Sequence, residues 1–343
     1  MARGRLGVVK AKLRSGWLRR WRRWLLVLSI GFVGLNALAF RHAWAMSHFA
    51  PAGNRTESPE ELSRWAKLKV LFTGVSLPRP VNRRTPAELG LEFATVRVAV
   101  EPAVDLEAWR IPSTTNGPVV VAFGGYGGSK DGLLPVAREF HRMGAEVWLV
   151  DFRGCGGSSG DVTSIGFHEA DDVAAAVRQA TTGSPRPVLL FGTSMGAAAA
   201  LHAVHRGLVS PAGMILECPF DRLLSTAGNR FRLMHLPEFP LAHLLVFWGG
   251  AQLGFNGLAH NPVDYAVSVR CPTLLFQGDR DRRVTVAQAG QIAEKLGTNG
   301  RFVIFSGLGH ESYLAGQPER WREEVSALWF RVMSPVPPSP SAR

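Results

Sequence analysis

Residues 188–196 read Val188-Leu189-Leu190-Phe191-Gly192-Thr193-Ser194-Met195-Gly196, and four alanines and a leucine follow at 197–201. An apolar run of strand length stops at Gly192, and a helix-favouring segment begins after Ser194. A turn this tight fits beside its neighbours only where side chains lack a Cβ, which accounts for the glycines at 192 and 196. The stretch therefore predicts a strand, a turn that carries Ser194, and a helix.

A serine at the start of a helix is placed for nucleophilic chemistry. The amides at the N-terminus of the helix face developing negative charge, so we expect the backbone N–H of Met195 to form half of an oxyanion hole. A G-x-S-x-G string also arises by chance in a chain with 37 glycines. The interpretation therefore depends on whether other segments supply a base and an acid.

Charge is distributed unevenly along the 343 residues. Of the net charge of +12, nine positive charges lie in residues 1–23, which contain no acid, and only +3 belongs to the other 320 residues. This distribution argues against a nucleic-acid-binding face on the folded domain. Three cysteines, Cys155, Cys218 and Cys271, are too few and too scattered for a disulfide framework or a zinc site.

Residues 24–40 form a run of seventeen residues without a formal charge, directly after the basic tail. Trp21 and Trp24 stand at one end of this run and Trp44 at the other, about 30 Å apart along a helix, which fits tryptophans at the two interfaces of a bilayer. We therefore expect a transmembrane signal anchor over residues 24–46.

Basic residues stay on the cytoplasmic side of a membrane, so the N-terminus is expected in the cytoplasm and residues 47–343 on the extracytoplasmic side. The alternative is a cleaved secretory signal, because Ala43-Trp44-Ala45 offers a small-x-small cleavage pattern; the domain would then be secreted. A buried core helix is disfavoured by the nine cations that precede the run.

The rest of the chain alternates between strand and helix patterns. Residues 94–100 and 106–111 predict a hairpin, and strands and helices then alternate. Such alternation predicts a mainly parallel sheet covered by helices on both faces. The expected strands are 118–123, 146–151, 188–191, 214–217, 273–277 and 302–305, and the expected helices are 131–143, 166–180, 195–206, 286–296 and 317–332.

Two segments flank this domain, which we place at residues 93–333. Residues 47–92 are expected to be a linker that packs on the domain. A helix start at Ser58-Pro59 and a short helix within 62–75 are expected there. Residues 334–343 are rich in proline and predict a disordered tail.

Two strands end in residues that suit catalysis. The strand at 273–277 runs into Asp279 and Asp281, and the strand at 302–305 runs into His310. His310 is expected to be the general base that takes the serine proton, while an aspartate holds its imidazole in the right tautomer. Both aspartates are candidates for that role.

With these motifs, residues 94–333 resemble the α/β-hydrolase superfamily, especially its serine-aminopeptidase-like and acyl-thioesterase-like branches. The resemblance implies the α/β-hydrolase fold, with Ser194 as nucleophile and His310 as base. The family pattern G-x-x-D-x-x-V aligns with residues 278–284, which makes Asp281 the implied acid.

The resemblance also implies a second oxyanion donor. The family has a His-Gly-x-x-Gly turn after its third strand, where this chain reads Gly124-Gly125-Tyr126-Gly127-Gly128 and so departs from the pattern at Gly124. The backbone N–H of Tyr126 is the implied donor. Asp151 and Arg153 fall in a turn that resembles the family's D-x-R-G motif, and we interpret them as loop scaffolding.

These residues predict acyl transfer to water without a cofactor or a metal. The glycine string lacks the spacing of a dinucleotide or P-loop motif, and no spacing of His, Cys and carboxylates suggests a metal site. A serine nucleophile excludes the aspartate chemistry of dehalogenases and epoxide hydrolases. We predict a serine hydrolase that cleaves a carboxylic ester or thioester through an acyl-enzyme on Ser194.

The expected substrate is a small, lipid-like acyl ester or thioester. Residues 219–265 form an insertion where this fold places its lid, and the apolar run at 244–248 would either cap the serine or pack on the core. A membrane-tethered peptidase is one alternative, with Glu217, Asp221 or Glu238 holding the substrate amine. A non-catalytic binding module on the same scaffold is the other.

Overall fold

The computed structural model describes residues 3–57, 61–183 and 185–334, and an eight-stranded sheet forms the centre of the domain. The strand order is β1-β2-β4-β3-β5-β6-β7-β8. The β1–β2 and β2–β4 pairs are antiparallel, and the remaining pairs are parallel. The strands are β1 (Ala94–Glu101), β2 (Val104–Ile111), β3 (Val119–Phe123), β4 (Glu146–Val150), β5 (Val188–Thr193), β6 (Gly213–Glu217), β7 (Thr273–Gly278) and β8 (Gly300–Phe305).

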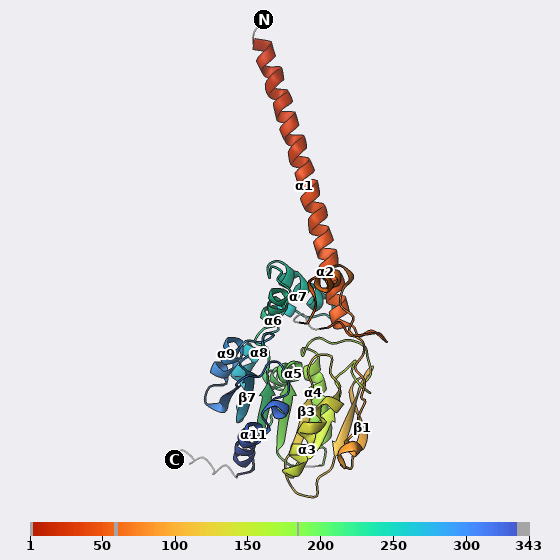
Figure 1. The fold of residues 1–343 in the computed structure, drawn as a ribbon, viewed down its shortest axis with the longest axis vertical. Helices are drawn as coiled ribbons and strands as arrows, with labels where there is room; N and C mark the ends of the chain where they lie inside the picture. The colour runs from red at the N-terminus through yellow and green to blue at the C-terminus, as the bar shows by residue number, and fades with distance from the viewer. Residues whose placement is uncertain (1–2, 58–60, 184, 335–343) are drawn as a thin grey trace.

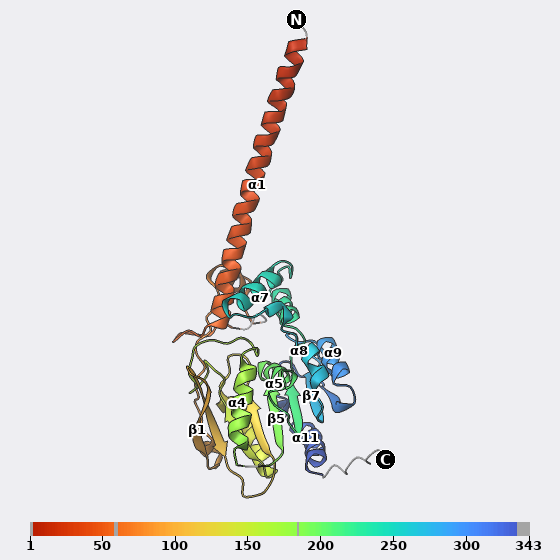
Figure 2. The same cartoon turned by 180° about the vertical axis from the view of Figure 1, so that it is seen from behind.

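Helices cover both faces of this sheet (Figures 1 and 2). On one face lie α4 (Glu169–Thr181), α5 (Met195–His205) and α9 (Val286–Leu296). On the other lie α3 (Leu134–Arg142) and α11 (Pro318–Met333). The α/β-hydrolase fold with a mainly parallel sheet, expected from the sequence, is confirmed.

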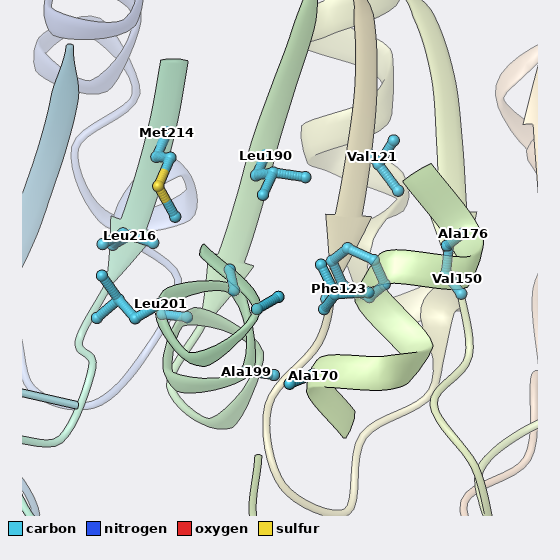
Figure 3. Close-up of a cluster of buried hydrophobic side chains, with 14 of the residues drawn as sticks. Val121, Phe123, Val150, Ala170, Ala176, Leu190, Ala199, Leu201, Met214 and Leu216 are labelled. Carbon is cyan, nitrogen blue, oxygen red and sulfur yellow. The ribbon is translucent and has the colours of Figure 1, made fainter. Parts of the chain in front are cut away.

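Each central strand contributes to two cores, because successive side chains point to opposite faces of a sheet. In β3, Val121 belongs to the core beneath α4 and α5, and Val120 to the core beneath α3 and α11. Figure 3 shows the first core, in which Leu190 joins alanines such as Ala170 of α4 and Ala199 of α5. The small alanines allow these two helices to pack closely on the sheet.

The helix α1 (Arg3–Ser47) has 45 residues and projects from one end of the domain (Figure 1). The part from Arg19 to Ser47 is long and apolar enough to cross a membrane, by length and composition. The helix starts well before the expected span at 24–46, since the Arg and Lys residues of the tail are themselves good helix formers.

The segment after α1 runs back along the domain. Phe49 is buried, and its backbone N–H donates to the carbonyl of Asp161 at 2.7 Å. The short helix α2 (Arg64–Thr73) follows, and the Ser63 side chain accepts from its first turn. The helix start expected at Ser58-Pro59 and nearly all of the expected C-terminal tail lie outside the described residues.

The insertion between β6 and β7 folds into helices, of which α7 packs beside α1. These helices are α6 (Leu223–Leu233), α7 (Leu241–Gln252) and α8 (Pro262–Tyr265), and α8 packs against α5 and α9. Trp248 Nε1 donates to Asn36 Oδ1 of α1 at 3.1 Å, and Gln252 Nε2 donates to the carbonyl of Phe40 at 2.8 Å. Within the apolar run at 244–248, Val246 is buried and Trp248 bonds to α1, whereas Phe247 is exposed.

Two buried ion pairs hold the loop that follows β4. Arg153 donates to Asp172 of α4 from Nη2 at 2.6 Å and from Nε at 3.0 Å. The buried Lys130 donates to Asp151 and, at 2.8 Å, to Glu107. Asp151 and Arg153 therefore act within the scaffold, as interpreted from the sequence.

We expect Arg153→Met to lower the free energy of unfolding by about 3 kcal/mol or more, because the fully buried carboxylate of Asp172 loses its guanidinium. Urea unfolding of the full chain in detergent, followed by circular dichroism, measures the loss. The control is Arg153→Met/Asp172→Leu, which removes both charges and should recover part of it. A double variant less stable than Arg153→Met alone would contradict this account.

Candidate active site

Ser194 lies on a sharp turn between β5 and α5, with a φ of +53°. A Cβ on Gly192 would come within 2.6 Å of Ala197 N, and one on Gly196 within 2.6 Å of Phe123 O. Only glycine allows this approach of strand, helix and neighbouring loop. The turn leaves the Ser194 hydroxyl at the carboxyl edge of the sheet.

Three residues meet at this edge. Ser194 Oγ lies 3.1 Å from His310 Nε2, and His310 Nδ1 lies 2.7 Å from Asp281 Oδ2. Ser194 follows β5, Asp281 follows β7 and His310 follows β8, so strands of one parallel sheet bring together side chains that are 116 and 29 positions apart in the chain. This is the geometry of a nucleophile, a base and an orienting acid.

The structure brings Asp281, and not Asp279, to His310. Asp279 Oδ1 instead accepts from the backbone N–H of Gly307 at 2.7 Å. The second oxygen of Asp281 accepts from the backbone N–H of Val284 at 3.0 Å, which fixes the carboxylate in the orientation that faces the imidazole.

The surroundings shift the pKa values of this pair in opposite directions. Burial raises the pKa of Asp281. The hydrogen bond with His310 and those from nearby backbone N–H groups lower it by a larger amount, so the net pKa lies below its usual range. Burial lowers the pKa of His310, whereas the interactions with Cys218 and with the carboxylate of Asp281 raise it, so its net pKa lies above the usual value. The carboxylate thus stays ionised beside the imidazole.

Cys218 is part of the site, although the sequence analysis gave it no role there. It follows β6 with a φ of +42°, and its Sγ lies 4.0 Å from His310 Nε2. The one feature of the sequence that could have indicated this role is that Cys218 directly follows a strand, β6, which lies next to β5. Cys218, Asp281 and His310 offer metal-ligand atoms within 4.8 Å of one another, but the latter two already form the relay with Ser194.

The loop after β3 lies against the serine. A Cβ on Gly125 would lie 3.5 Å from Ser194 Cβ. Tyr126 and Met195, the two expected oxyanion donors, line the same pocket as Ser194. Their backbone N–H groups stay the expected oxyanion donors, one from this loop and one from the first residue of α5.

Contacts from the N-terminal segment hold this loop. The Tyr126 hydroxyl donates to the carbonyl of Met46, at the end of α1, at 2.5 Å, and burial raises the pKa of Tyr126 to about 12. Arg55 Nη1 donates to the carbonyl of Gly127 at 2.8 Å. These bonds fix a loop in which Gly124 replaces the histidine that the family usually has.

The pocket at Ser194 is mainly apolar. Its walls come from the lid helices, from the loop before α4 and from the end of α1. Ala43 and Met46 of α1, Leu223 of α6 and Val246 of α7 all line it. A hydrocarbon chain suits such walls better than a charged group does.

The three carboxylates considered for a peptidase do not line this pocket in the described part of the chain. Glu217 is buried in the core, where Trp321 Nε1 donates to it at 2.8 Å. Asp221 is also buried, and Glu238 lies 3.5 Å from Arg232. No carboxylate is therefore placed to hold a substrate amine beside Ser194 in these residues.

Comparisons with known proteins support the family and the fold. A family model described as serine aminopeptidase, S33, matches residues 115–237. An uncharacterised protein of Mycobacterium tuberculosis is 30% identical over 222 residues, which cover 63% of this chain and 71% of that protein. An esterase structure from Pyrococcus furiosus has a TM-score of 0.63 and 25% identity, over 75% of this chain and 97% of that chain.

A relative described as a membrane protein also matches. This uncharacterised protein of Saccharomyces cerevisiae is 27% identical over 138 residues, which cover 40% of this chain and 49% of that protein. Taken together, the fold, the family model and the relatives show that the chain belongs to the α/β-hydrolase superfamily and is an enzyme of that class. The resemblance inferred from the sequence is confirmed.

We expect kcat/KM for a soluble ester to rise with pH through a raised pKa. Only the neutral imidazole of His310 accepts the serine proton, and this form is populated above the raised pKa. Asp281→Asn removes a negative charge that raises the pKa, so the rising limb should move to lower pH while the plateau falls about 10³- to 10⁴-fold. Measuring kcat/KM of both proteins at about ten pH values between pH 5 and pH 10 tests this prediction. A rising limb of the pH profile that lies at the same pH in Asp281→Asn as in the natural chain would contradict the prediction.

Proposed function

We propose that the protein is a membrane-anchored serine hydrolase that cleaves a carboxylic ester or thioester through an acyl-enzyme intermediate. One observation carries the proposal: the relay from Ser194 Oγ to His310 Nε2 at 3.1 Å, and from His310 Nδ1 to Asp281 at 2.7 Å, beside an apolar pocket. The proposed hydrolase domain is residues 93–333, with residues 219–265 as its lid.

In this proposal Ser194 Oγ attacks the substrate carbonyl carbon while His310 Nε2 takes the hydroxyl proton. Asp281 accepts the Nδ1–H bond and stabilises the imidazolium. The backbone N–H groups of Tyr126 and Met195 stabilise the oxyanion. The intermediate then expels the alcohol or thiol, which receives the proton from His310. Water, activated by the same imidazole, releases the carboxylic acid.

We further propose that α1 anchors the enzyme through residues 24–46, joined to the domain by residues 47–92. The nine basic residues of the tail place the N-terminus on the cytoplasmic side and the hydrolase domain on the other. A helix that meets the length and hydropathy needed to cross a membrane supports the anchor.

Full-length protein in detergent should react with a short-chain fluorophosphonate and hydrolyse p-nitrophenyl butyrate. Ser194→Ala should abolish labelling and lower kcat/KM by about 10³-fold or more, and His310→Ala should do the same. Gel fluorescence and ester kinetics measure these effects.

Ser306→Ala is the matched control, because Ser306 is an exposed serine in the loop before His310. It should be labelled as fast as the natural chain. Labelling that persists in Ser194→Ala would refute the proposed nucleophile. A folded natural chain without any labelling would favour the non-catalytic binding module.

A further inference from the structure

The pocket at Ser194 continues into a second groove that runs along α1. Met46, Arg230 and Leu245 line both cavities, which are therefore contiguous. The groove lies between α1, α2 and the lid, and α1 contributes Leu38 and Ala39 to it. Apart from Arg230 and one histidine, every side chain that lines the groove is apolar.

With residues 24–46 as the proposed anchor, the groove would lie at the depth of a bilayer leaflet. The uncharged run of α1 begins at Trp24, and crossing the hydrocarbon core takes about 20 residues, so the far interface falls near Trp44. Leu38 and Ala39 then lie below that interface, within the leaflet. Trp248 of α7 is bonded to α1 at this depth, so part of the lid is immersed as well.

Exposed aromatic side chains gather at the same end of the molecule. On α2, Trp65 is 83% exposed and Phe72 is 63% exposed, and on the lid segment Phe239 is 73% and Phe247 is 51% exposed. Figures 1 and 2 show α2 and α7 beside α1 where it leaves the domain. Aromatic side chains of this kind are stable at a membrane interface and unfavourable in water.

Another groove beside the site has charged and polar side chains among its apolar walls. It shares Tyr126, Met46 and Arg230 with the Ser194 pocket, and Arg55 and Thr56 line it. Both grooves thus adjoin the pocket of Ser194, and the first is almost entirely apolar whereas the other also has charged side chains.

We propose that the substrate is an acyl ester of a bilayer lipid, whose chain enters sideways from the leaflet through the groove along α1. The polar head group occupies the groove at Arg55. This inference rests on the proposed function and assigns its substrate class. Ser194 Oγ takes the acyl group as the ester C–O bond breaks, and the lipid oxygen leaves with the proton from His310. The helix α1 is then a wall of the substrate site as well as an anchor.

The test compares two probes on the full chain in phosphatidylcholine vesicles. Hexadecyl fluorophosphonate partitions into the bilayer, and ethyl fluorophosphonate stays in water. Ala39→Trp fills the groove, whereas Ala37→Trp places the same side chain on an exposed face of the same helix. We expect Ala39→Trp to slow labelling by the hexadecyl probe about tenfold or more, with ethyl-probe labelling within about threefold of the natural chain. Ala37→Trp should change neither rate.

Equal hexadecyl-probe rates in Ala39→Trp and Ala37→Trp would overturn the entry route. Labelling by the ethyl probe shows that the active site is intact. If Ala39→Trp also loses labelling by the ethyl probe, Leu38→Asn is used for the same comparison, because it changes the groove without adding bulk. A natural chain that reacts with the ethyl probe but not with the hexadecyl probe would overturn the lipid substrate alone. Failure of both probes on the natural chain would instead refute the proposed hydrolase.

Discussion

The turn from β5 into α5 is made by Ser194 at a φ of +53°, and the site is built around this backbone conformation. A positive φ on a non-glycine residue costs on the order of 1–3 kcal/mol, so the surroundings must hold it in place. They do so through the hydrogen bond from Ser194 N to the carbonyl of Glu217 at 2.7 Å, and through the close contacts that Gly192 and Gly196 permit. The strained turn keeps the hydroxyl clear of the sheet.

The parallel sheet supplies the partners of this hydroxyl. Parallel strands end at a common edge, so the residues that follow β6, β7 and β8 gather beside the end of β5. In this way Cys218, Asp281 and His310 meet Ser194, although long segments of chain separate them. The same topology explains why the insertion between β6 and β7 lies over the serine, where it forms one wall of the pocket.

The N-terminal helix α1 also contacts the active site. Its last turn holds the oxyanion loop through the bond from the Tyr126 hydroxyl to the carbonyl of Met46. Its side packs against α7 and lines a groove next to the pocket of Ser194. The helix α1, the insertion between β6 and β7 and the pocket at Ser194 therefore share side chains, so a displacement of α1 would alter the loop after β3 directly.

By itself, the sequence determined the features that are local or follow from chain order. These are the turn at Ser194, the alternating strands and helices, the apolar run of α1, and the order of serine, acid and histidine. Only the tertiary structure decided between Asp279 and Asp281 by hydrogen bonding, placed Cys218 beside the imidazole, and packed α7 against α1. The deciding contacts join distant segments: Tyr126 lies 80 positions from Met46, and Trp248 lies 212 positions from Asn36. An apolar face has the same sequence pattern whichever partner covers it, so the partner appears only when the chain is folded.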